Sequence, residues 1–129
     1  MRSIGLWRWT RHWIAVVDGR SMEPALRAGD RLLIRRCTPA QVRRGAIVVA
    51  REPLPILPVD RVIVKRVLAV PGDPVPRDRV PALRDVAGDV VPEGSLVVLG
   101  DNPAESRDSR EFGYLDAGHL LGVAVRPMR

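Results

Sequence analysis

The sequence predicts a mostly β protein, a compact antiparallel β domain with one or two short helices. Short runs rich in Val, Ile and Leu alternate with turn residues at the spacing typical of sandwiches and barrels. The 12 Pro and 11 Gly residues are spread along the chain and interrupt it too often for a helical bundle. The length of 129 residues suits one domain, and 46% hydrophobic residues suffice for one core. We therefore expect residues 1–129 to form a single domain.

The expected strands are the apolar runs that lie between these turns. Residues 52–59 contain three prolines and indicate a loop, and residues 74–89 indicate an irregular excursion. Two short helical segments are expected, at Met22–Arg27 and Leu115–Leu120. The six expected strands are Trp13–Val17, Arg31–Arg36, Ala46–Arg51, Arg61–Val70, Ser95–Gly100 and Leu121–Arg126.

The chain is basic, with a net charge of +6. The charges are scattered, aromatic residues make up only 4%, and the sequence contains no nucleic-acid-binding motif. We therefore expect a solvated, arginine-rich surface and no nucleic-acid partner. Cys37 is the single cysteine, which excludes an internal disulfide and a cysteine-based zinc site. No metal and no cofactor are expected.

The N-terminal residues 1–18 mix Trp7, Trp9 and Trp13 with arginines. Their longest apolar stretch, Trp13–Val17, is far shorter than the ~20 residues of a membrane-spanning helix. It is also shorter than the apolar region of a secretory signal. We therefore expect no transmembrane segment in this chain. Residues 1–12 are expected to form a flexible lead-in or to lie at a membrane surface, where Trp and Arg side chains are favoured.

Lys65 is the one lysine among 21 basic residues. Arginine cannot lose its proton in a protein, whereas a buried lysine can lose one and act as a base. Alternation along the expected strand places Lys65 on one face with the apolar residues Ile63 and Val67. Burial on that face would lower the lysine pKa, because desolvation disfavours the charged amine. This pattern indicates a possible general base. A lysine that extends its amine to solvent would have the same sequence pattern.

A candidate nucleophile, Ser21, lies in a turn between an expected strand and a short helix. A serine nucleophile benefits from exposure at a tight turn, with a backbone N–H ready to bind the oxyanion. Gly19 gives the backbone its freedom, and Pro24 stiffens the exit from the turn. The alternative role of Ser21 is to cap the N-terminus of the short helix.

A third polar segment follows the expected strand that ends at Gly100. It begins with Asp101 and Asn102 and continues through Ser106 to Arg110. Such a loop could simply cap its own backbone. It could also bring Ser106 beside the lysine amine, with an ion pair between Asp108 and Arg110 that locks the loop.

Together, the three segments resemble bacterial type I signal peptidases, which use a serine–lysine dyad in a β-rich catalytic domain. The matches occur in the family's order and span residues 19–113. The resemblance implies a compact β domain of the signal-peptidase catalytic type. The matching motifs are Ser21-Met22-Glu23-Pro24 with Leu26 and Gly29-Asp30, Lys65-Arg66-Val67 with Pro71-Gly72-Asp73, and Gly100-Asp101-Asn102 with Ser106, Asp108-Ser109-Arg110 and Gly113.

The resemblance also implies a role for each motif residue. Ser21 would attack the scissile carbonyl, and Lys65 would take its proton. Ser106 would orient the lysine amine, and the backbone N–H of Ser21 would donate to the oxyanion. Met22 would line the pocket for a small residue before the cut. The residues that would support the site are Pro24, Asp101, Asn102, Asp108 and Arg110.

Several positions depart from the family pattern. Gly19 stands where some members have a serine that donates to the oxyanion, so a second donor is absent or supplied by the backbone. Pro103 replaces a common arginine, and Ala69 replaces a common glycine. Residues 73–90 are short where many members carry a larger subdomain. The usual membrane anchor is not found in this sequence.

The resemblance leaves several functions open, all with a peptide or preprotein as partner. The first is a serine endopeptidase that removes N-terminal leader or signal peptides after small residues, at the extracytoplasmic membrane surface. The second is a dedicated cytoplasmic propeptide protease, because residues 100–104 are similar to proteases that mature nickel superoxide dismutase. The third is an inactive module that binds such peptides. A histidine-based hydrolase would need His12 or His119, and both are expected at the surface.

Overall fold

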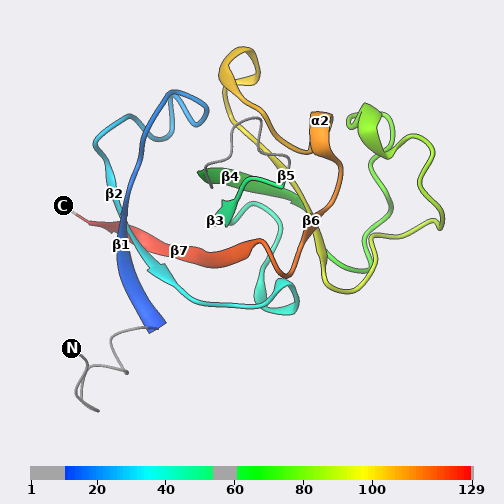
Figure 1. Ribbon diagram of the computed structural model, residues 1–129, viewed down its shortest axis with the longest axis horizontal. Helices are drawn as coiled ribbons and strands as arrows, with labels where there is room; N and C mark the ends of the chain where they lie inside the picture. Colours follow the sequence, from blue (N-terminus) through cyan, green and yellow to red (C-terminus); the bar gives the residue numbers. More distant parts are fainter. Residues whose placement is uncertain (1–10, 54–60, 129) are drawn as a thin grey trace.

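The computed structural model describes residues 11–53 and 61–128, and these form one seven-stranded sheet (Figure 1). All neighbouring strands are antiparallel, in the order β1-β2-β7-β3-β4-β5-β6. The described residues contain one α-helix, the short α2 (Ser109–Phe112). The expectation of a mostly β, antiparallel fold with a short helix is therefore confirmed. The strands are β1 (His12–Val16), β2 (Arg31–Arg35), β3 (Ile47–Arg51), β4 (Val62–Ala69), β5 (Ser95–Leu99), β6 (Leu115–Asp116) and β7 (Leu120–Met128).

The six expected strands are all present, with ends that differ by one or two residues. The alternation expected for the strand that contains Lys65 is seen in β4, where every second residue from Ile63 to Ala69 is buried. The expected lead-in lies outside the described residues as far as residue 10, and His12 is the first residue of β1. Most of the expected loop at 52–59 also lies outside them.

The helix expected at Leu115–Leu120 is wrong. Leu115 and Asp116 instead form β6, which pairs with β5, and a turn follows before β7. The turn is closed by a hydrogen bond from the N–H of His119 to the carbonyl of Asp116 (2.9 Å). The leucine spacing fits a helix, but Gly118 weakens one, and the fully buried Leu115 packs into the sheet core.

The helix expected at Met22–Arg27 is only a series of turns. It contains a single helical hydrogen bond, from the N–H of Leu26 to the carbonyl of Met22 (2.9 Å). The helix α2 lies instead in the polar loop after β5. Its capping box explains this, because Asp108 accepts from the backbone of Arg110 while its own N–H donates to Glu111 (3.2 Å).

Three apolar clusters stabilise the fold. The largest joins β3, β4, β5 and β7, and a second lies under the turns that follow β1. The third anchors the expected irregular excursion, where Val80 and Leu83 are almost fully buried (green in Figure 1). Truncating any of these side chains would cost the burial energy and leave a cavity. The core thus anchors β4 and β5, and β4 and the loop after β5 carry the site.

Candidate active site

Lys65 lies in the middle of β4 and is only 4% exposed. Its Nζ donates a hydrogen bond to Ser106 Oγ at 2.9 Å. Burial lowers the pKa of Lys65, because desolvation disfavours the charged amine. The nearby carboxylates of Asp108 and Glu52 oppose this shift but do not reverse it. The amine therefore loses its proton more readily than that of an exposed lysine.

A chain of hydrogen bonds orients the hydroxyl of Ser106, the hydrogen-bond partner of Lys65. The Ser106 hydroxyl donates to Asp108 Oδ2 at 2.7 Å, so its oxygen accepts from Lys65. A neutral amine that donates to Ser106 keeps its lone pair free to accept a proton. The pair of Ser106 and Asp108 thus orients the amine of Lys65 through one of its N–H groups and leaves the lone pair of the neutral amine free.

Asp108 is fully buried and is surrounded by donors. It accepts from the backbone N–H of Gly100 (2.8 Å) and from the backbone and guanidinium of Arg110 (3.1, 2.9 and 2.5 Å). Burial by itself would raise the pKa of Asp108, but the hydrogen bonds from Arg110, Gly100 and Ser106 outweigh it and lower that pKa. The expected pairing of Asp108 with Arg110 is therefore present, and the carboxylate stays ionised.

Ser21 lies in the turn after β1, and the loop after β5 holds it there. Asn102 donates from its backbone N–H to the carbonyl of Ser21 (2.8 Å) and from Nδ2 to that of Arg20 (3.0 Å). Asp101 in turn accepts two hydrogen bonds from Arg66 of β4, at 2.9 and 2.8 Å. Asn102 and Asp101 therefore connect the Ser21 turn to the strand that carries Lys65.

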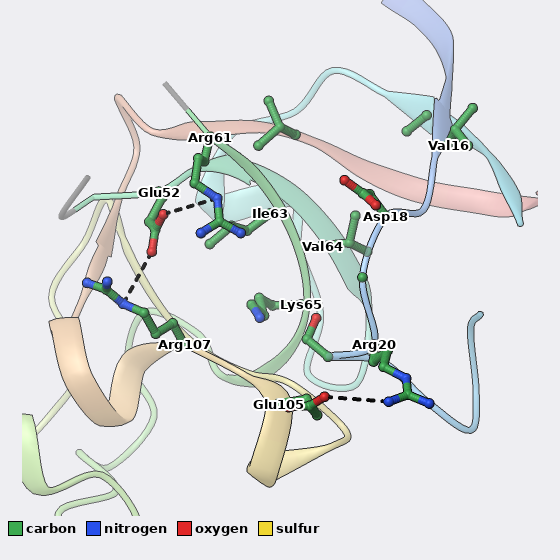
Figure 2. A pocket seen from close by; sticks show the side chains of 14 residues that line it. Val16, Asp18, Arg20, Glu52, Arg61, Ile63, Val64, Lys65, Glu105 and Arg107 are labelled. Atoms are coloured by element: carbon green, nitrogen blue, oxygen red, sulfur yellow. Dashed lines mark ion pairs between the residues drawn. The ribbon is translucent and has the colours of Figure 1, made fainter. Parts of the chain in front are cut away.

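Ser21 and Lys65 line the same cavity, of about 460 Å³ (Figure 2). Gly19 lines it as well, with a φ of +77° that suits glycine. Met22 is 1% exposed and packs into the apolar cluster beneath the turn, and it is not among the residues that line this cavity. Pro24 is exposed and follows a cis peptide bond.

Gly100 allows Ser21 and Ser106 to approach each other. A Cβ at position 100 would collide with the hydroxyl of Ser106 and would lie 2.8 Å from the carbonyl oxygen of Ser21. Neither group can move away without disturbing the hydrogen bonds to Lys65 or Asn102. The glycine of this motif is therefore required by close packing between the two serine-bearing segments.

We expect Gly100→Ala to reduce the peptide cleavage that the resemblance implies at least about tenfold, and to lower the free energy of unfolding by about 1–3 kcal/mol, as overpacking does. Cleavage kinetics and urea denaturation would measure the two effects. Gly118→Ala is a matched control, because a Cβ there meets nothing within 4 Å. Wild-type kinetics in Gly100→Ala would show that Ser106 and Ser21 need not be so close.

The cavity also contains charged residues that sequence reasoning missed. Glu52, at the end of β3, has a side chain that is 2% exposed and forms ion pairs with Arg61 (3.8 Å) and Arg107 (3.3 Å). All three line the cavity (Figure 2). No sequence signal identifies Glu52, because it lies beside a proline-rich loop and reaches the site only through the pairing of β3 with β4.

Other chemistries have less support in the described residues. Neither His12, which is exposed, nor the half-buried His119 is among the residues that line the cavity. Within residues 11–53 and 61–128, no three His, Cys, Asp or Glu side chains are grouped so that they could hold a metal ion. The same residues contain no helix that is both long and apolar enough to cross a membrane.

Comparison with known proteins matches residues 7–81 and 77–128 to the family model described as signal peptidase, peptidase S26. The chain is 31% identical to a probable signal peptidase I-1 of Synechocystis sp., over 84% of this chain and 67% of that protein. It is 36% identical to the mitochondrial ATP-independent inner membrane protease subunit 1b of Arabidopsis thaliana, over 85% and 66%. It is also 25% identical to the inactive signal peptidase IA of Staphylococcus aureus, over 83% and 73%. The chain belongs to the signal peptidase family, peptidase S26.

Proposed function

We propose that this chain is an active serine endopeptidase that removes N-terminal leader or signal peptides after small residues, with Ser21 as nucleophile and Lys65 as general base. The main support is the environment of Lys65. Its amine is buried, its pKa is lowered, and it is oriented by Ser106 in the cavity that Ser21 also lines. A lysine held in this way suits proton transfer.

In the proposed reaction, the Ser21 hydroxyl attacks the carbonyl carbon of the scissile peptide bond and Lys65 takes its proton. The backbone N–H of Ser21 donates to the developing oxyanion. The protonated Lys65 then gives its proton to the leaving amine, which leaves an acyl-enzyme on Ser21. Water, deprotonated by Lys65, attacks this ester and releases the acyl product and the free serine.

The free edge of β4 offers a place for the substrate. β4 pairs with β3 along Val62–Arg66 but with β5 only from Arg66 onward. Beside the cavity, residues 62–65 therefore have an edge that β5 does not cover. An extended peptide could pair with this edge as an added strand, which would bring one of its peptide bonds to Ser21 and Lys65.

The experiment is peptide cleavage by the purified protein, with products identified by mass spectrometry. The substrates are a leader peptide that ends in Ala-X-Ala and a peptide that covers a propeptide junction. We expect wild type to cut at least one of them after a small residue, and Ser21→Ala to cut neither, because it lacks the attacking oxygen. Cleavage that persists in Ser21→Ala would exclude Ser21 as nucleophile.

The relative named inactive makes a second candidate worth testing, a module that binds peptides without cutting them. Retention of Ser21, Lys65 and Ser106 in one site favours the enzyme. A folded wild-type protein that binds both peptides but cuts neither would favour the binding module. Which of the two peptides is cut would distinguish leader removal from the maturation of one dedicated partner.

A further inference from the structure

A charged cluster of Glu52, Arg61 and Arg107 lies in the cavity beside Lys65. Glu52 is 2% exposed, whereas the side chains of Arg61 and Arg107 are 64% and 34% exposed. A molecule in the cavity can therefore reach the guanidinium groups but not the carboxylate. The accessible charge of this cluster is positive, although Glu52 holds the two arginines in place.

The cluster occupies one side of the cavity. In Figure 2, Arg61, Glu52 and Arg107 lie together to the left of Lys65. Val16, Asp18 and Val64 lie on the other side, next to the end of β1. One wall of the cavity therefore offers Val16 and Val64 together with the carboxylate of Asp18, and the other offers guanidinium groups.

An extended substrate would meet both walls in turn, because side chains alternate along a strand. A small residue before the cut suits the apolar wall at Val16 and Val64. The residue that precedes it then points to the opposite wall, toward Arg61 and Arg107. This step depends on the proposed function, which supplies the position of the cut.

We propose that the charged cluster binds an acidic side chain at the second residue before the cut, so that the enzyme selects substrates with Glu or Asp there. Other charges in the cavity do not reverse this preference. Glu105 forms an ion pair with Arg20 (3.8 Å), and Asp18 lies on the apolar side. The two guanidinium groups present several N–H donors, which suit a carboxylate.

The test compares three peptides that differ only at this residue, with Glu, Gln or Lys. For wild type at low salt, we expect kcat/KM for the Glu peptide to exceed that for the Gln peptide about twofold to fivefold, as for a partly exposed ion pair. The ratio should approach one in high salt.

Arg61→Gln and Arg107→Gln should each reduce the ratio of kcat/KM for the Glu peptide to that for the Gln peptide, and Arg61→Glu should favour the Lys peptide. Arg84→Gln, an exposed arginine outside the cavity, is the control of equal charge change and should keep the wild-type ratio.

Binding to Ser21→Ala, measured by fluorescence anisotropy, separates this inference from the proposed function. We expect the Glu peptide to bind that variant more tightly than the Gln peptide. Equal cleavage of the Glu and Gln peptides by wild type would overturn the acidic preference and leave the peptidase intact. If no peptide is cut, the proposed function fails, and the ratio of binding affinities alone decides whether the cluster selects an acid.

Discussion

Lys65→Arg should reduce kcat/KM for a cleavable peptide by at least about a thousandfold, in the upper range of a general-base contribution. An arginine at this position is positively charged and still has N–H groups that can donate to Ser106. Its guanidinium cannot lose a proton at the pH of the assay, and Ser21 would have no base. Steady-state kinetics with the Ala-X-Ala peptide would measure the loss, and circular dichroism would check the sheet.

Lys65→Met is the matched comparison, because it keeps an unbranched side chain that is shorter by one atom and removes both charge and basicity. The two variants should be equally inactive, since neither has a group that can accept the proton of Ser21. In wild type, kcat/KM should rise with pH through a pKa below that of an exposed lysine, because only the neutral amine is the base. Activity above a few percent in Lys65→Arg, or a flat profile from pH 6 to 9, would contradict the assignment.

The sequence was sufficient to locate β4 because its residues are apolar except for Lys65 and Arg66, and turn residues follow at Pro71 and Gly72. The period of two along a strand then placed Lys65 on the face of Ile63 and Val67, which is the buried face. Short secondary-structure elements were harder to predict from the sequence. Leu115 and Asp116 form a two-residue strand that exists only because β5 is beside it, and no local pattern specifies such a pairing. The capping box of α2, by contrast, is visible in the sequence as Asp108 followed by Glu111.

The contacts within the site are also of two kinds, those between residues close in the sequence and those between distant segments. Ser106 and Asp108 are two residues apart, and the Asp108–Arg110 pairing could be predicted from the motif. Contacts between distant segments could not. Glu52 forms its ion pair with Arg107 because β4 pairs with β3 on one side and with β5 on the other, which brings the end of β3 near the loop after β5. Met22 is placed by the packing of an apolar cluster and not by the motif that contains it.

Asp108→Asn should lower the free energy of unfolding at pH 7 by about 3–5 kcal/mol, the cost of breaking a buried ion pair. Both carboxylate oxygens of Asp108 accept from donors, on one side from Gly100 and Ser106 and on the other from the backbone and Nε of Arg110. An amide placed in either orientation directs an N–H group at one of these sets and leaves Arg110 without its counter-charge. Urea denaturation would measure the loss, with Asp85→Asn, at an exposed position, as the control.

The pH dependence of the difference in unfolding free energy between wild type and Asp108→Asn distinguishes the loss of the carboxylate charge from a change in packing. The folded state lowers the pKa of Asp108, so its stabilising effect is complete above the pKa of the unfolded chain, about 3.9. That effect is lost as the pH falls through the lower folded pKa, because the carboxyl group then takes up a proton. The gap in unfolding free energy between wild type and Asp108→Asn should therefore be full at pH 7 and narrow below pH about 4. A gap that stays constant to low pH would mean that Asp108 acts through packing, and Ser106 would then need another acceptor to orient Lys65.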